Sequence, residues 1–149
     1  MGYSGYTING SIKCLKHVGV KPVGQASAIC ANQHGGQLPL PLNQQENNDF
    51  FKAFKTFNLR SGSSIGNGVA LDLTDVASEG TFVRLSNGQA PTYTFWDTFY
   101  HKEPNNYGGM EDNVFMYTSV PFWSPNAYGT WNDVSGNATH DVICETDRL

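Results

Sequence analysis

Side chains that carry oxygen donors gather in the second half of the sequence. They are the carboxylates and carboxamides of Asp75, Glu79, Glu103, Asn105, Asn106, Glu111, Asp112, Asn132 and Asp133. Calcium takes about six to eight oxygen ligands in flexible geometry, whereas magnesium keeps most of its waters and uses few protein ligands. Loops that bring these side chains together would therefore form a calcium site.

The same carboxylates allow two other interpretations. An acidic loop cluster is most often solvated surface, because charged side chains are mostly exposed. Glu103 and Glu111 are also candidates for a glycosidase pair, since two carboxylates that flank a sugar bond recur in that chemistry. Carboxylates committed to calcium are poor proton carriers, so we expect a binding protein and not an enzyme.

Two helices are predicted ahead of the oxygen-rich half. In residues 24–34, Ala26, Ile29 and Cys30 recur at helical spacing, and the following Gly35-Gly36 pair supplies a stop signal. A short first helix is therefore expected there.

The second helix is predicted from about Gln44 to Phe57. Asn43 offers an N-cap, and Glu46 follows three residues later, which is the pattern of a helix start. The stripe that faces the core is expected to comprise Phe50, Phe51, Phe54 and Phe57.

After Arg60, short β-prone runs alternate with Gly- and Asn-rich turns. Strands are predicted at residues 69–73, 81–85, 114–117 and 142–144. Residues 87–109 are polar and lack clear periodicity, which in a compact domain indicates a functional loop. The predicted fold class is therefore α+β.

The composition indicates one folded domain that spans residues 1–149. The chain is 39% apolar and 13% aromatic but only 15% charged, with a formal net charge of −4. Its nine Lys and Arg residues are scattered, so we expect no nucleic-acid partner. No run approaches the roughly 18 apolar residues of a membrane span, so we expect no membrane insertion.

Three cysteines, Cys14, Cys30 and Cys144, match no zinc motif, and an odd number favours one disulfide and one remaining thiol. A disulfide indicates an oxidising compartment, so we expect a secreted or extracellular protein. The sequons at Asn9 and Asn137 agree with secretion, and their glycosylation is left open.

Several motifs follow one another in the order and spacing of a known family. Any one of them arises by chance in many proteins, but together they make the chain resemble the C-type lectin domain, specifically its mannose-type members. The resemblance covers most of the chain. The motifs are Glu103-Pro104-Asn105, Glu111-Asp112, Trp131-Asn132-Asp133 and Ile143-Cys144-Glu145.

The resemblance implies a principal calcium on which a sugar binds. Two vicinal hydroxyls of one sugar ring would complete the coordination, and the same side chains would hydrogen-bond the sugar. Glu-Pro-Asn implies mannose, fucose, N-acetylglucosamine or glucose, and hence glycans of cell or microbial surfaces as partners. The implied ligands are Glu103, Asn105, Glu111, Asn132 and Asp133, with Pro104 in a cis peptide.

Further residues are implied to support this site. Tyr107 is the first candidate for stacking on a sugar ring, ahead of Phe122, Trp123 and Tyr128. The resemblance also implies an accessory calcium, so one or two calcium ions, or more, are expected. Calcium binding is expected to stabilise the fold. The implied accessory ligands are Asp75, Glu79, Asn106, Glu111 and Asp112.

The resemblance also implies a fold and a disulfide. The expected architecture is two helices with small antiparallel sheets and a long calcium-binding loop region. Cys30 would pair with Cys144, and Cys14 would be free or would link two chains in a homo-oligomer. The family's second disulfide is missing, because Asn113 and Gly136 stand at its positions. The usual Trp-Ile-Gly-Leu motif is reduced to residues 70–73.

A second functional class remains beside the sugar-binding one. A C-type lectin-like module can keep its calcium and recognise a protein or another non-sugar surface. Exchanging Glu103 for Gln and Asn105 for Asp separates the two, since only a sugar binder should shift toward galactose.

Overall fold

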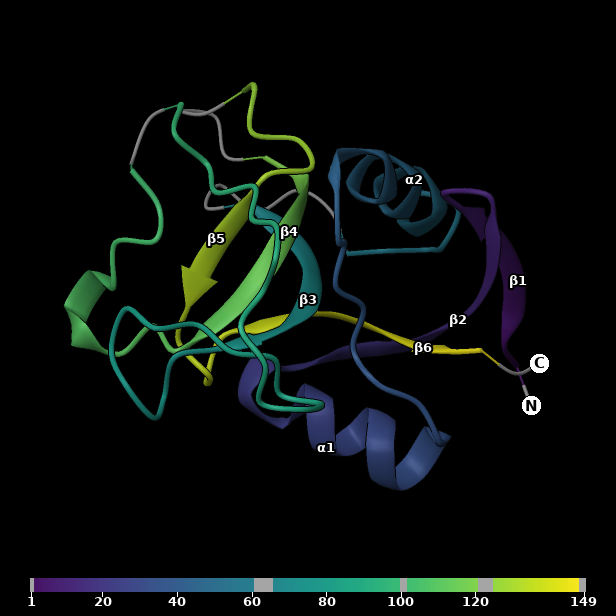
Figure 1. The fold of residues 1–149 in the computed structure, drawn as a ribbon, viewed down its shortest axis with the longest axis horizontal. Helices are drawn as coiled ribbons and strands as arrows, with labels where there is room; N and C mark the ends of the chain where they lie inside the picture. The colour runs from purple at the N-terminus through teal and green to yellow at the C-terminus, as the bar shows by residue number, and fades with distance from the viewer. Residues whose placement is uncertain (1, 61–65, 100–101, 121–124, 148–149) are drawn as a thin grey trace.

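The computed structural model describes residues 2–60, 66–99, 102–120 and 125–147. His101, Phe122 and Trp123 lie outside these residues. Within them, two α-helices and a short 3₁₀-helix accompany a six-stranded sheet (Figure 1). The elements are β1 (Ser4–Ile8), β2 (Ser11–Pro22), α1 (Val23–His34), α2 (Gln44–Phe54), β3 (Asn67–Thr74), η1 (Tyr107–Gly109), β4 (Asn113–Ser119), β5 (Trp131–Val134) and β6 (Thr139–Thr146).

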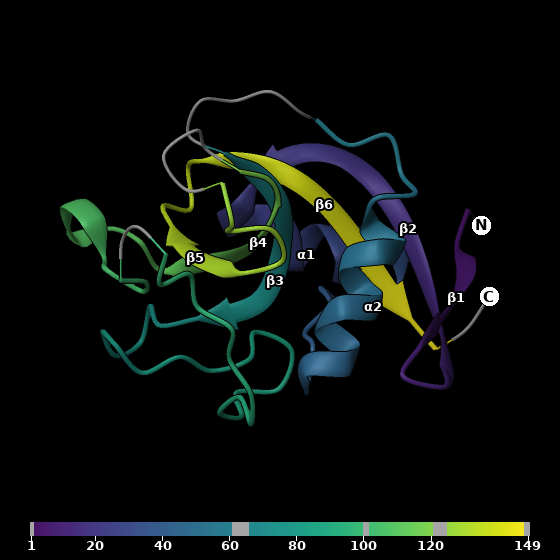
Figure 2. The same ribbon diagram turned by 90° about the horizontal axis from the view of Figure 1, so that it is seen from above.

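The sheet is mixed and has the order β1-β2-β6-β3-β4-β5. The pairing of β3 with β6 is parallel, and the other neighbouring strands pair antiparallel. β2 and β6 run together as a long curved ribbon, with α1 and α2 on different sides of it (Figure 2). The α+β class and the two helices are thus confirmed.

Helix α2 begins where the sequence predicts, at Gln44. The Asn43 side chain accepts a hydrogen bond from the Glu46 N–H at 2.8 Å, which confirms the predicted N-cap. α2 ends at Phe54, so the prediction that it reaches Phe57 was wrong. The chain tightens instead into a turn in which Phe57 N–H donates to the Phe54 carbonyl at 3.1 Å. The Phe57 ring still packs against the core.

The strand predicted at residues 81–85 was also wrong. Within this run, only Val83 bridges to a strand residue, Thr74. Arg84 is drawn instead to the buried Asp72, whose carboxylate accepts from Arg84 Nε at 2.9 Å and from Ser86 Oγ at 2.6 Å. Asp72 stands inside the altered Trp-Ile-Gly-Leu region, and this contact gives the alteration a structural role.

The hairpin of β1 and β2 was not predicted. Asn9 and Gly10 form its two-residue turn with φ values of 47° and 80°, the left-handed conformation of a type I′ turn. The Asn-Gly dipeptide between β-prone residues was the available sequence signal. The hairpin makes the sheet continuous from the N-terminus.

The disulfide between Cys30 and Cys144 joins α1 to β6, as the resemblance implied. Cys14 is the free cysteine, and it is buried in β2 with 1% of its surface exposed. A thiol so buried is unavailable to a second chain, so the structure gives no support to a dimer linked through Cys14.

The connection between β5 and β6 lacks the family's second disulfide but is held by the backbone. Gly24 N–H donates to the Gly136 carbonyl at 3.0 Å, and Val23 N–H donates to the Ala138 carbonyl at 2.9 Å. A Cβ atom at Gly136 would lie 3.1 Å from the Asn113 amide nitrogen. The residues at the two former cysteine positions are therefore still neighbours.

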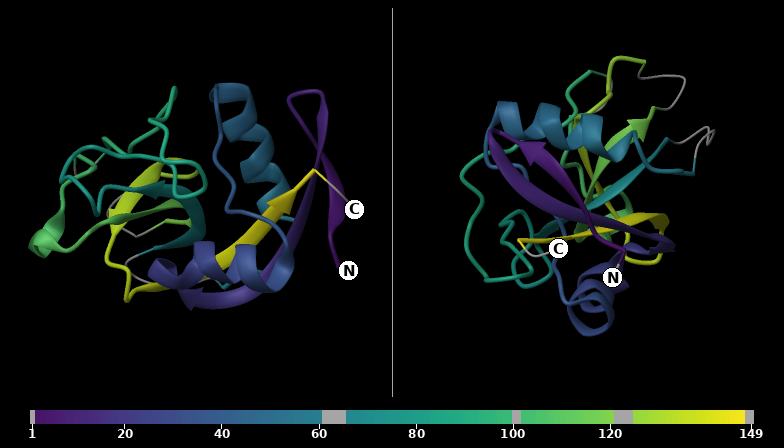
Figure 3. Two further views of the ribbon diagram at one scale, coloured as in Figure 1. Left: turned by 60° about the horizontal axis from the view of Figure 1, so that its bottom comes forward. Right: turned by 90° about the vertical axis from the view of Figure 1, so that its right-hand side faces the viewer.

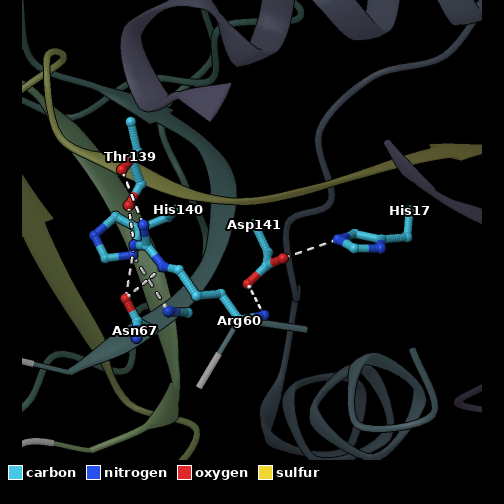
Figure 4. Close-up of polar contacts among 7 residues, drawn as sticks. His17, Arg60, Asn67, Thr139, His140 and Asp141 are labelled. Atoms are coloured by element: carbon cyan, nitrogen blue, oxygen red, sulfur yellow. Dashed lines mark hydrogen bonds and ion pairs between the residues drawn. The ribbon is translucent and has the colours of Figure 1, made fainter. Parts of the chain in front are cut away.

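A buried polar network ties the segment after α2 to the centre of the sheet (Figure 4). The Asp141 carboxylate has no exposed surface and accepts hydrogen bonds from His17 Nε2 at 2.8 Å and from Arg60 N–H at 3.0 Å. The Arg60 guanidinium donates to the Asn67 side chain at 2.7 Å and to the hydroxyl and carbonyl of Thr139. The network thus joins β2, β3 and β6.

The neighbouring His140 is expected to make the fold sensitive to acid. Its ring stacks on Phe115, and burial first and the Arg60 charge second lower its pKa from 6.5 to about 4. The unfolded chain therefore binds the proton between pH 6.5 and 4 while the native chain does not. The contribution of His140 to the free energy of unfolding is therefore fully present above pH 6.5 and falls toward pH 4, by up to about 3 kcal/mol.

Urea unfolding of the wild type and of His140→Gln across this range checks that prediction. The difference between the two proteins is the useful quantity, because it cancels the opposite contribution of the crowded carboxylates described below. The wild type should lose more stability on acidification than the variant. If the free energies of unfolding of the two proteins changed in parallel with pH, His140 would not be the cause of the acid sensitivity.

Candidate metal and ligand-binding site

The long loop brings Glu103 and Asn105 to Asp133 at the end of the sheet. The Glu103-Pro104 peptide is cis, as expected. The Asn105 N–H lies 3.1 Å from Glu103 Oε2 and 3.1 Å from Asp133 Oδ1. Two motifs that are 28 residues apart in the sequence therefore meet at a single backbone amide.

The next residues close a tight turn around the same carboxylates. Asn106 adopts a left-handed conformation and donates its N–H to Asp133 Oδ2 at 2.7 Å. Tyr107 N–H donates to Glu111 Oε1 at 2.7 Å, and Glu111 N–H donates to the Asn106 side chain at 3.0 Å. Glu111 is thereby held close to Asp133.

Asn132 presents an unsatisfied oxygen. Its Nδ2 donates to the Tyr117 hydroxyl at 2.9 Å, while its Oδ1 is buried without a hydrogen-bond partner. A buried acceptor left without a donor costs free energy, and a bound cation would satisfy it. The site therefore fits a metal by the chemistry of its donors as well as by their convergence.

The ionised carboxylates of this cluster are destabilised first by burial and then by one another. Burial, hydrogen bonding to Asp133 and the charges of Asp133 and Glu111 raise the pKa of Glu103 to about 8. Burial raises the pKa of Glu111 to about 7, with the Tyr107 N–H opposing and the Asp133 charge adding to the shift. A cation would relieve this crowding, because it favours the ionised forms.

A second acidic cluster lies beside the loop that follows β3. Ligand atoms of Asp75, Glu79 and Asp112 all lie within 4.8 Å of one another. Asp75 Oδ2 accepts the Gly80 N–H at 2.9 Å, but its Oδ1 is buried without a partner. Burial and the charges of Asp75 and Asp112 raise the pKa of Glu79. Three of the five predicted accessory ligands are thus together.

The other two predicted accessory ligands lie beside Asp133 instead: Asn106 N–H donates to Asp133, and Glu111 N–H donates to the Asn106 side chain. Tyr107, the predicted stacking residue, is 81% exposed at the start of η1. Figure 1 shows η1 projecting at the end of the molecule opposite the two termini. An aromatic ring is therefore available at the rim of the loop region.

Two residues that sequence reasoning missed help to position the site. Tyr117 orients the Asn132 amide through its hydroxyl. The buried Asp97 accepts the Glu103 N–H on its carbonyl at 2.9 Å and donates its own N–H to the Trp131 carbonyl at 2.9 Å. No local pattern marks either residue, because their partners Asn132 and Trp131 lie in a different part of the sequence.

Comparison with known proteins agrees with this architecture. Residues 20–146 match the model of the Lectin C-type domain family. The chain therefore belongs to the C-type lectin domain family, whose members are generally non-enzymatic binding modules. None of the described helices is long and apolar enough to cross a membrane.

Three solved structures illustrate the shared fold. The C-type lectin CEL-I from Cucumaria echinata is 19% identical, with a TM-score of 0.69 and 91% of each chain covered. The human scavenger receptor C-type lectin carbohydrate-recognition domain is 21% identical, with a TM-score of 0.70, over 99% of this chain and 97% of that one. The cow CD23 carbohydrate-recognition domain is 26% identical, with a TM-score of 0.65, over 92% of this chain and 89% of that one.

Proposed function

We propose that residues 1–149 form one extracellular carbohydrate-recognition domain that binds mannose-type sugars through calcium. The observation that carries the proposal is the meeting of Glu103, Asn105 and Asp133 at one backbone amide. These side chains supply hard oxygen donors of the kind calcium prefers. The cow CD23 domain adds support, since its structure was determined in the presence of a GlcNAc2Man3 oligosaccharide.

The principal calcium would be held by Glu103, Asn105, Glu111, Asn132 and Asp133, and a second ion by the cluster of Asp75, Glu79 and Asp112, with Asn106 and Glu111 nearby. A carboxylate only accepts hydrogen bonds, whereas a carboxamide both donates and accepts. Glu103 would therefore accept a hydrogen bond from one sugar hydroxyl, while the Asn105 amide donates one to a hydroxyl oxygen. This pairing selects the hydroxyl geometry of mannose, fucose, N-acetylglucosamine and glucose.

The site is open and polar, so a single contact with one sugar ring is expected to be weak. Binding at several sites on one assembly would raise the overall strength without new contacts. An oligomer is therefore part of the proposal, although the burial of Cys14 means that another surface must join the chains. The disulfide between Cys30 and Cys144 supports an extracellular location.

A glycan array, probed with and without a calcium chelator, tests the proposal. The wild type should bind glycans that end in mannose, fucose or N-acetylglucosamine, and the chelator should remove the signal. The Glu103→Gln, Asn105→Asp variant should move toward galactose, because the donor and acceptor positions are exchanged.

A matched variant keeps the test specific. Gln25→Glu, Asn32→Asp makes comparable changes at exposed positions of α1, away from the calcium ligands, and should retain the wild-type preference. Calcium binding without any glycan signal on a multivalent probe would instead favour a module that recognises a protein or another non-sugar surface.

A further inference from the structure

A groove of about 290 Å³ lies between α2 and the turn that leads into β5. This volume is near the lower end of the roughly 300–1,000 Å³ range of small-molecule sites. None of the proposed calcium ligands lines it. The lining residues are Gln44, Asn47, Asn48, Phe51, Lys52, Phe95, Tyr128 and Gly129.

One side of the groove is aromatic. The Tyr128 side chain is 53% exposed and meets Phe51 edge to face, with ring centroids 6.2 Å apart. An exposed phenol ring offers a flat apolar face and a polar edge. This combination suits a sugar ring, which has C–H groups on its faces and hydroxyls around its edge.

The α2 side of the groove carries hydrogen-bond donors. Gln44 Nε2 donates to Asn48 Oδ1 at 2.9 Å, and Gln44 Oε1 accepts from the Tyr93 hydroxyl at 2.8 Å. These bonds use the Asn48 oxygen and leave its amide N–H groups to a ligand. The arrangement therefore favours a ligand rich in oxygen acceptors.

Among the described residues that line the groove, Lys52 is the one charged residue, and its charge is positive. Lys55 Nζ lies 6.0 Å from the centroid of the Tyr128 ring and donates to the Thr118 carbonyl at 3.0 Å. The Asp49 carboxylate, three residues before Lys52, is bound by the Asn9 N–H at 2.8 Å and by Gln45 at 3.0 Å. The groove thus contrasts with the acidic calcium end and fits an anionic ligand.

The floor of the groove is fixed without any metal. Asn47 is 1% exposed, donates to the Gly129 carbonyl at 2.9 Å and accepts from Trp131 Nε1 at 2.8 Å. Both ends of this amide are engaged, so the turn is held against α2. A ligand would therefore meet a preformed site, which lowers the cost of ordering on binding.

We propose that this groove is a second, calcium-independent site for a single sugar ring that bears a carboxylate or a sulfate. The ring packs on Tyr128, its hydroxyls accept from Asn48, and its anionic group pairs with Lys52. Because no calcium ligand takes part, the site operates or fails independently of the proposed mannose site.

Amide NMR titrations in excess chelator test the proposal with matched probes. Glucuronic acid and N-acetylglucosamine 6-sulfate are compared with neutral glucose and N-acetylglucosamine. At least one acidic sugar should shift the amide signals of the groove and bind more tightly than its neutral partner. The two acidic probes distinguish a carboxylate from a sulfate as the preferred group.

Variants assign the binding to the groove. Tyr128→Ala should weaken it roughly tenfold through loss of the stacking face, and Lys52→Ala roughly threefold through loss of an exposed ion pair. Lys13→Ala removes the same charge at the far edge of the sheet and should change little, and Asp133→Asn should bind as the wild type does. Each variant's amide spectrum verifies its fold.

Any one of three results would overturn the proposal: no binding of either acidic sugar, equal binding of neutral and acidic sugars, or equal effects of Lys13→Ala and Lys52→Ala on binding. Loss of calcium-dependent mannose binding in the array leaves this test unaffected, so failures of the two sites are distinguishable.

Discussion

Replacing Asp133 with Asn is expected to weaken calcium binding by roughly 100-fold or more, because the proposed central ligand would lose its charge. Asp133 is 1% exposed, and its two oxygens accept the N–H groups of Asn105 and Asn106. In the Asp133→Asn variant the side-chain NH₂ group would face one of these two backbone N–H groups, so one hydrogen bond would be lost. Titration calorimetry measures the change in affinity.

Thermal unfolding provides a second readout for Asp133→Asn. Calcium should raise the melting temperature of the wild type but not that of the variant, since only a cation that binds the native state stabilises it. Asp147→Asn is the matched control, because that side chain is 84% exposed near the termini. Wild-type calcium affinity in Asp133→Asn would remove Asp133 from the metal site.

The second large effect is expected at the centre of the sheet. Asp141→Asn should lower the free energy of unfolding by about 2–4 kcal/mol, because two hydrogen bonds lose their buried charged acceptor and the new amide group has no acceptor of its own. The Asp141 side chain has no exposed surface and joins His17 to the backbone of Arg60 (Figure 4). Its replacement would weaken the attachment of the segment after α2 to β6, because the Arg60 N–H and His17 would lose their charged acceptor.

Urea denaturation with a constant m-value measures this loss. Asp49→Asn serves as the control, because its carboxylate also bonds to a side chain and a backbone amide but lies in a partly exposed position on α2. It should cost far less. Equal losses in the two variants would show that burial of the Asp141 network adds nothing.

Local signals in the sequence predicted the helices better than the strands. The Asn43 cap and the stop at Gly35 act within one turn of helix, so they can be recognised from neighbouring residues. The run at residues 81–85 has a strand-like composition, but Arg84 pairs with Asp72, 12 residues earlier, and only Val83 of the run bridges to a strand. Such a partner is invisible to a local pattern.

The candidate site shows the same division. The residues with oxygen donors were recognisable by type, and the resemblance suggested their grouping. That Asn105 and Asp133 meet, or that Tyr117 and Asp97 hold their neighbours, depends on how the loop crosses the sheet. Those contacts follow from the tertiary fold and required the structure.

Ser4 and Glu145 lie on either side of Leu15 in adjacent strands, so these two residues, each close to one end of the chain, are about 10 Å apart. Both ends face away from η1 and the loops that carry the oxygen donors (Figure 3). A stalk, tag or further polypeptide joined at either end would therefore present the same face outward. Copies anchored side by side on one support would all point their loops toward an opposing surface.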